Sequence, residues 1–147
     1  MTAPASQRPD KLSLIVYSGA YDKIHYALVL ASAAAAIGTK ATLFFTMDGC
    51  RALMKSGWRD LPLDQPTAQG FKTGGAMDDE FKSRRLADFE QLLVACVELG
   101  VRFIVCELGL KARGLAMDGL RDDVPVEIAG AVTFLEDASR TGTMVFI

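Results

Sequence analysis

A cysteine between a strand and a helix is the residue of this sequence best placed for chemistry. Cys106 follows the strand-like run 101–105 and precedes residues 107–113, which can turn helical. Ligands and reactive groups collect at such junctions of a parallel sheet, and the positive end of a helix favours a thiolate over a thiol. Cys106 is therefore a candidate nucleophile. The alternative is a packing role, because unpaired cysteines are among the most buried residue types.

Polar residues that follow the first two predicted strands are candidates for binding a substrate beside this cysteine. The strands are expected at 12–17 and 40–46. If they neighbour the third strand, their loops converge on one crevice, in which Lys23 or His25 could stabilise a thiolate or persulfide. The candidate binding residues are Tyr21, Asp22, Lys23, His25, Met47, Asp48, Cys50 and Glu107.

Several of these candidates have a second interpretation. Glu107 opposes ionisation of the thiol if its carboxylate faces the sulfur. Cys50 is either a packing residue or a thiol that resolves an oxidised Cys106, and a disulfide between them requires Cα atoms within about 7 Å. His25 is either part of the crevice or a helix surface residue. Cys96 lies on the apolar face of a predicted helix, so we expect it in the core.

Residue counts and motifs exclude several enzyme classes. The chain has one histidine and three cysteines without a Cys-x-x-Cys pair, so we expect no metal site and no thioredoxin-type dithiol. The turn at 18–22 matches neither a Walker A loop nor a dinucleotide fingerprint, and no cofactor is expected. The chain also has no nucleophile elbow, so a serine hydrolase triad is not expected.

Charge, apolar runs and cysteine count limit the partners and the compartment. Sixteen basic and 18 acidic side chains give a formal net charge of −2, which attracts neither nucleic acid nor an anionic membrane. The longest apolar stretch, 26–37, falls short of the roughly 20 residues of a spanning helix. An odd cysteine number and the absence of a signal-like leader indicate free thiols in a reducing compartment. We therefore expect a cytoplasmic protein with no nucleic-acid or membrane partner.

Strand and helix patterns alternate along the chain. This alternation, with nearly continuous apolar strands, predicts an α/β fold: a single-domain three-layer α/β/α sandwich with a mostly parallel sheet of about five strands. The strands are expected at 12–17, 40–46, 101–105, 124–128 and 143–147, and the main helices at 23–37, 50–55, 78–99, 107–113 and 130–140.

Three local features of this scheme can be checked against a structure. Asp22 is expected to cap the first helix, and Asp78 or Asp79 to cap the long helix that reaches residue 99. The proline- and glycine-rich segment 58–77 predicts a long loop, which is a lid, a binding loop, an oligomer contact or a surface excursion. Residues 1–11 predict a flexible N-terminal arm, and 12–147 the folded domain.

The order and spacing of several motifs resemble the DsrE/DsrF-like family. The first is Tyr-Ser-Gly followed by Tyr-Asp-Lys, and the second is a strand that ends in Phe-Phe-Thr before a glycine. A cysteine motif and a Thr-Phe-Leu helix follow. These motifs lie at 17–19, 21–23, 44–49, 106–110 with Met117, and 133–136. The resemblance extends over nearly the whole chain after the arm.

The resemblance implies a homo- or hetero-oligomeric protein of sulfur-relay type. In this interpretation Cys106 accepts sulfane sulfur as a persulfide and passes it to an acceptor thiol, as a sulfur carrier or sulfurtransferase with donor and acceptor proteins as partners. Two alternatives stay open. One is a non-catalytic oligomeric binding module that uses the same crevice, and the other is a thiol redox sensor that uses Cys106 and Cys50.

Overall fold

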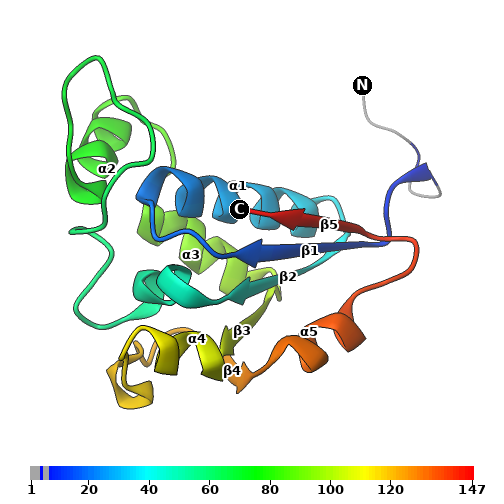
Figure 1. The fold of residues 1–147 in the computed structure, drawn as a ribbon. Helices are drawn as coiled ribbons and strands as arrows, with labels where there is room; N and C mark the ends of the chain where they lie inside the picture. The colour runs from blue at the N-terminus through cyan, green and yellow to red at the C-terminus, as the bar shows by residue number, and fades with distance from the viewer. Residues whose placement is uncertain (1–3, 5–6) are drawn as a thin grey trace.

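Five parallel strands form the centre of the molecule (Figure 1). The computed structural model describes residues 4 and 7–147, and the strand order in its sheet is β4-β3-β2-β1-β5. Every neighbouring pair is parallel. The predicted α/β class is therefore confirmed. The strands are β1 (Lys11–Val16), β2 (Lys40–Phe45), β3 (Arg102–Cys106), β4 (Val126–Ala129) and β5 (Thr143–Phe146).

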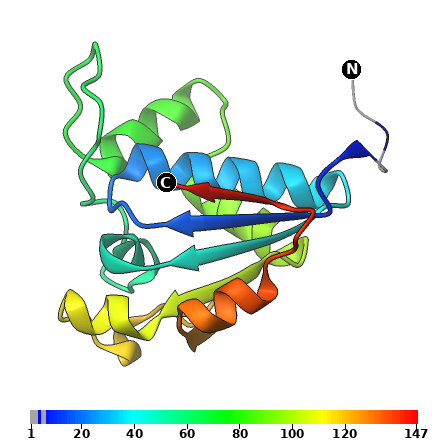
Figure 2. The same ribbon diagram turned by 45° about the vertical axis from the view of Figure 1, so that its right-hand side comes forward.

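Helices lie on both faces of this sheet. Figure 2 shows α1 and α3 on one side of the strands and the short helix α5 on the other, which gives the predicted three layers. The helices are α1 (Tyr21–Ala36), α2 (Gly74–Ser83), α3 (Phe89–Glu98), α4 (Glu107–Ala112) and α5 (Ala131–Asp137), with 3₁₀ helices η2 (Met47–Leu53) and η3 (Met117–Gly119).

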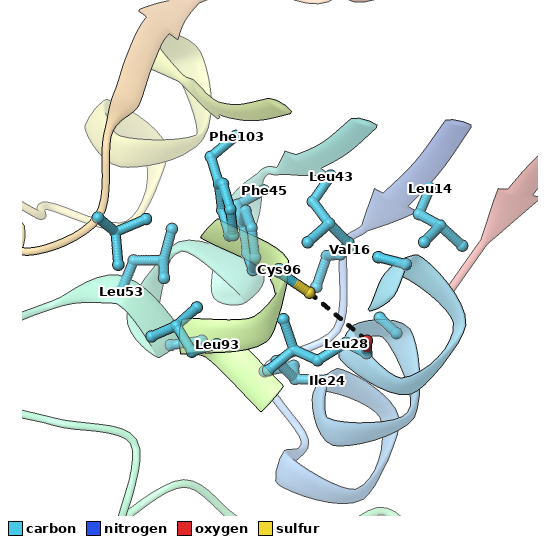
Figure 3. Close-up of a cluster of buried hydrophobic side chains, with 14 of the residues drawn as sticks. Leu14, Val16, Ile24, Leu28, Leu43, Phe45, Leu53, Leu93, Cys96 and Phe103 are labelled. Atoms are coloured by element: carbon cyan, nitrogen blue, oxygen red, sulfur yellow. Dashed lines mark hydrogen bonds between the residues drawn. The ribbon is translucent and has the colours of Figure 1, made fainter. Parts of the chain in front are cut away.

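The larger hydrophobic core fills the space between the sheet and the α1–α3 layer (Figure 3). Alternate residues of each strand point into it, as the two-residue period of a strand requires. Small side chains on α1, such as Ala27 and Ala31, let this helix lie close to the sheet. Cys96 is fully buried here, and its Sγ donates a hydrogen bond to the Leu28 carbonyl, so the expected core position is confirmed.

A much smaller cluster lies on the opposite face, under α5. It contains Phe44, Ile104, Cys106 and Phe134, and we call it the α5 cluster. The rings of Phe44 and Phe134 stack with their centroids 4.7 Å apart. Phe134 is the one buried residue of α5. This helix therefore attaches to the sheet through little apolar burial.

The predicted long helix 78–99 is wrong, because the chain forms two helices there. Thr73 caps α2 by accepting a hydrogen bond from the Ala76 amide, and Asp88 forms a capping box with Gln91 at the start of α3. Between the helices Arg85 has a φ of 59°, which no helix residue adopts. Neither Asp78 nor Asp79 is a cap.

The predicted cap at Asp22 is also wrong. The first helix begins two residues earlier than predicted, at Tyr21, and its N-cap position is Ala20, without a side-chain hydrogen bond. The carboxylate of Asp22 instead accepts hydrogen bonds from the backbone amides of Asp64 and Gln65. It therefore fixes the long loop to the start of α1.

The segment 58–77 is shorter as a loop than its composition predicts. Trp58 is buried at its beginning, with its ring 4.5 Å from that of Phe89, and α2 takes up its last residues. The rest of the segment, up to residue 73, forms a loop that projects beside α2, at the upper left of Figure 1, away from α4. This position separates the loop from Cys106.

The predicted N-terminal arm is only partly described. Residues 1–3 and 5–6 lie outside the described residues. At the other end of the arm, Lys11 already belongs to β1, and the Asp10 carboxylate accepts a hydrogen bond from the Thr141 hydroxyl.

Candidate functional site

Cys106 lies at the strand-to-helix junction that the sequence predicts. It is the last residue of β3 and the N-cap of α4, and it pairs with Ala129 of β4 in the sheet register. Only 5 % of the residue is exposed, because its side chain belongs to the α5 cluster. The junction thus combines a site-like position with a shielded thiol.

A glycine in α4 sets the position of this helix. A Cβ added at Gly109 would lie 2.5 Å from the Met47 backbone nitrogen and 2.8 Å from Oγ1 of Thr46. Real side chains do not approach backbone so closely, so only glycine permits this contact between α4 and the start of η2. The contact holds the end of β2 beside the Cys106 junction.

The carboxylate next to Cys106 has a partner. Glu107 lies 3.1 Å from the Lys111 Nζ, one turn further along α4. Both side chains are exposed. The ion pair balances the negative charge that sequence reasoning identified as an obstacle to thiolate formation.

An open hollow adjoins the junction and has a volume of about 660 Å³. One wall is α4 and the other is the connection between β4 and α5. Its mostly apolar surface gives a ligand or a partner segment a place to lie beside Cys106. The lining residues are Glu107, Leu108, Lys111, Ala112, Ala129 and Gly130.

The other two thiols are in different surroundings. Cys50 is fully buried in the larger core, and its Sγ lies 3.5 Å from the Phe45 carbonyl oxygen, to which it donates. Burial raises the pKa of the Cys50 thiol to about 12, and nearby Cys106 acts in the same direction. Burial also raises the pKa of Cys96 to about 12. All three cysteines are unpaired.

Asp48 connects η2 to the far end of α4. Its Oδ1 accepts hydrogen bonds from Nε of Arg51 at 3.1 Å and Nε of Arg113 at 3.0 Å. Met47, just before it, has a φ of 49° and touches the Gly109 position. The two arginines did not stand out in the sequence, because only the fold brings Arg113 back to the second strand.

Asp22 and Lys23 line a second hollow, of about 560 Å³, at the ends of β1 and β5. Lys23 forms an exposed ion pair with Asp64 at 3.6 Å. The aromatic rings of Tyr17 and Phe146 form part of its wall, with centroids 5.3 Å apart. This second hollow shares no lining residue with the hollow beside Cys106.

Tyr21 and His25 face the helices α2 and α3. Tyr21 is fully buried, and its hydroxyl donates to Asp78. Burial, reinforced by Asp78, raises the pKa of this phenol above its ordinary value. His25 places Nε2 2.9 Å from the Ala87 carbonyl oxygen, and its ring packs against Phe81. Both residues join α1 to its neighbouring helices.

The predicted crevice is therefore divided over three places in the fold. Met47, Asp48, Cys50 and Glu107 lie around the β3–α4 junction, whereas Asp22 and Lys23 line the second hollow. The remaining pair, Tyr21 and His25, belongs to the helix layer. Sequence reasoning also missed that Phe134 shares a buried cluster with Cys106, although Phe134 lies within the Thr-Phe-Leu motif.

Metal sites and membrane-spanning helices each have a recognisable structural pattern. Among residues 4 and 7–147, no three His, Cys, Asp or Glu side chains gather where they could hold a metal. Across the same residues, no helix combines the length and the apolar character that crossing a bilayer requires.

Comparisons with known proteins identify a family and relatives of this chain. The model of the DsrE/DsrF-like family matches residues 10–145. The sulfur carrier protein DsrE2 of Allochromatium vinosum is 28 % identical over 158 residues, which cover 93 % of this chain and 98 % of the relative. The protein YrkE of Bacillus subtilis is 25 % identical over 161 residues, which cover 97 % of this chain and 99 % of that relative.

Two solved structures have a similar fold. MTH1491 of Methanobacterium thermoautotrophicum superposes with a TM-score of 0.52 and 14 % identity, covering 93 % of this chain and 98 % of that one. The ychN protein of E. coli gives a TM-score of 0.50 and 16 % identity, covering 93 % of this chain and 97 % of that one. At these identities the likeness concerns the fold alone.

Proposed function

Because this chain belongs to the DsrE/DsrF-like family, we propose that it is a sulfur carrier that holds sulfane sulfur as a persulfide on Cys106. A sulfur-relay role is supported by the family and by the relative that is itself a sulfur carrier. One observation carries the assignment to Cys106. It is the one thiol outside the larger core, and its neighbour Glu107 and its register partner Ala129 line an open hollow, while the other two thiols lie fully buried in the larger core.

The transfer proceeds by thiol–persulfide exchange. The Cys106 thiolate attacks the outer sulfur of a donor persulfide, R–S–SH. A sulfur–sulfur bond forms on Cys106, the bond in the donor breaks, and the donor leaves as the thiolate R–S⁻. An acceptor thiolate then attacks the outer sulfur on Cys106 and restores its thiolate. The two steps conserve atoms and charge and need no external oxidant.

The residues around Cys106 have distinct tasks in this proposal. The pairing of Glu107 with Lys111 limits the repulsion between a carboxylate and the attacking thiolate. The hollow along α4 receives the donor or acceptor, and its apolar lining suits a protein segment. A chain that turns over in this way acts as a sulfurtransferase, and one that only holds sulfur acts as a carrier.

The proposal includes a homo-oligomer in the cytoplasm. Exposed aromatic and aliphatic side chains, among them Tyr17, Met144 and Phe146, lie along β5 and the end of β1. Surfaces of this kind are buried in subunit interfaces. Three unpaired cysteines fit a reducing compartment. Light scattering should give a multiple of the 15.8 kDa chain mass, and a monomer at every concentration would contradict the oligomer.

Intact-mass analysis tests the persulfide directly. The reduced protein is incubated with polysulfide or thiosulfate, together with Cys106→Ser and Cys50→Ser variants. We expect a gain of one sulfur, about 32 Da, that reductant reverses and that only Cys106→Ser abolishes.

Other outcomes of this experiment favour the alternatives. No adduct on Cys106 with any donor would leave the binding-module interpretation, in which the hollow along α4 takes a ligand without sulfur chemistry. A loss of two hydrogens that depends on both Cys106 and Cys50 would instead identify a redox sensor.

A further inference from the structure

The described structure shields the sulfur that the proposed function needs. Exchange requires a second sulfur to approach the Cys106 Sγ to bonding distance. Cys106 is only 5 % exposed, and its side chain is part of the α5 cluster. The donor therefore cannot reach the thiol unless an element around it moves.

Among the elements of the α5 cluster, the helix α5 is the one with the fewest attachments. The strands β2 and β3 each pair with a neighbour on both sides. The seven residues of α5 have Phe134 as their one buried member and no side-chain cap at the N-terminus. The flanking apolar residues Val132 and Leu135 are 71 % and 60 % exposed. Short helices are marginal without tertiary packing, so removal of Phe134 takes away the one buried apolar contact of this helix.

The two ends of α5 are held differently. At its C-terminal end, Asp137 forms ion pairs with Lys11 and Arg102, both at 2.8 Å, and accepts a hydrogen bond from Thr42. These partners lie near the N-terminal edge of the sheet. At the other end, Gly130 has open space around its Cβ position and follows Ala129, the register partner of Cys106. The end held by ion pairs is thus remote from the thiol. The end next to the thiol is joined to β4 by Gly130 alone.

We propose that α5 is a movable cover over Cys106, with Phe134 as its plug and Asp137 as its tether. In the closed state Phe134 fills the α5 cluster and shields the thiol. When Phe134 leaves the cluster, α5 rolls about its axis between the Gly130 connection and the Asp137 tether, and Cys106 opens toward the hollow along α4. The role of this cover rests on the proposed carrier function. A shielded thiolate or persulfide on Cys106 is protected from oxidants until a donor or acceptor protein binds.

Cysteine alkylation measures the opening without any sulfur chemistry. The reduced full chain is treated with iodoacetamide, and mass spectrometry of peptides gives the rate at each cysteine. Cys50 and Cys96 serve as internal sensors of general loosening, because both belong to the larger core, whereas Cys106 belongs to the α5 cluster. The variants are Phe134→Ala, the milder Phe134→Leu, and Leu135→Ala as an exposed control on the same helix.

If α5 covers Cys106, the alkylation rates of the three cysteines should follow a specific pattern. Wild-type Cys106 should react far more slowly than in denaturant. Phe134→Ala should raise its rate about tenfold or more, as expected for loss of one buried aromatic side chain. Phe134→Leu should give a smaller rise, and Leu135→Ala should stay within about twofold of wild type. Cys50 and Cys96 should remain slow in all four proteins.

Three results would contradict the proposal that α5 covers Cys106. The first is a wild-type Cys106 as reactive as the denatured chain, and the second is an unchanged Cys106 rate in both Phe134 variants. The third is a parallel rise at Cys50 and Cys96, including in Phe134→Leu, which would show general destabilisation. If the mass experiment finds no persulfide but Phe134 still governs alkylation, the carrier function fails while the cover stands. If a persulfide forms but alkylation is unchanged in both Phe134 variants, the carrier function stands while the cover fails.

Discussion

The Tyr21 hydroxyl donates a hydrogen bond to the Asp78 carboxylate, and both side chains are fully buried. The same carboxylate oxygen accepts a hydrogen bond from the Phe89 backbone amide at 2.8 Å. One carboxylate therefore links α1, α2 and α3. Its other oxygen has no hydrogen-bond partner, and its nearest cation is the Lys82 Nζ at 3.9 Å. A buried group with these contacts is costly to remove.

Asp78→Ala should strongly destabilise the protein. The substitution leaves the Tyr21 hydroxyl and the Phe89 amide buried without an acceptor, and we expect the free energy of unfolding to fall by about 3 kcal/mol. Urea denaturation followed by circular dichroism measures the change. The neighbouring Asp79→Ala is the control, because Asp79 is exposed and pairs with Arg59 at the surface. Equal losses in the two variants would contradict the linking role of Asp78.

Lys111→Gln should slow persulfide formation on Cys106 at neutral pH. Without the lysine, the Glu107 carboxylate is unbalanced and opposes the thiolate. Since the pair is exposed and screened by solvent, we expect an effect of about two- to fivefold. The measurement is the initial rate of sulfur uptake, followed by intact mass. Lys55→Gln removes another exposed lysine, which pairs with Asp122, and should leave the rate unchanged. A slower rate in both variants would attribute the effect to net charge.

Acidification should weaken the tether of α5. Burial opposes the charge of Asp137, but hydrogen bonds from Lys11, Thr42 and Arg102 outweigh it and hold its pKa below the ordinary 3.8. The unfolded chain therefore binds the proton more readily. The stability from these contacts is fully present above about pH 4 and is lost as the pH falls through the lower folded pKa.

Hydrogen exchange of the α5 amides at different pH values measures this loss. Exchange in α5, corrected for the intrinsic pH dependence of amide exchange, should speed up below about pH 4 more than exchange in α1. Asp137→Asn should make α5 exchange fast already at neutral pH and remove most of the additional acid effect. The exposed neighbour Glu136→Gln should behave like the wild type. Uniform acceleration over α1 and α5 would point to global acid unfolding.

The strands and the Cys106 junction were predictable because their signals are local. Apolar runs of strand length and glycine stops define β1, β2 and β3 within one or two residues. The break between α2 and α3 was not predictable from helical periodicity, since the apolar spacing continues across it. The local signal that could have revealed it is the Asp88 and Gln91 pair, which has the spacing of a capping box.

The surroundings of Cys106 could not be predicted, because they depend on residues distant in the sequence. The Phe134 ring comes from a helix near the C-terminus, and Arg113 returns to Asp48 over 65 positions. Tyr21 and His25 follow β1, as a crevice residue would, but the helical rotation of α1 turns both toward α2 and α3. Spacing along the chain identifies an edge of the sheet, and packing decides which side chains face it.

Gly109→Ala should disturb the Cys106 junction more than any other small change in α4. The added methyl group would lie 2.5 Å from the Met47 backbone nitrogen, and backbone cannot yield as a flexible side chain does. Since α4 must shift away from η2, we expect a loss of about 1–3 kcal/mol in unfolding free energy. The shift also moves the N-cap of α4, so both the alkylation rate and the persulfide yield at Cys106 should change. Gly130→Ala is the matched control for stability, because a methyl group there meets no atom within 4 Å. A Gly109→Ala protein as stable as Gly130→Ala and as reactive at Cys106 as the wild type would show that α4 does not depend on this contact.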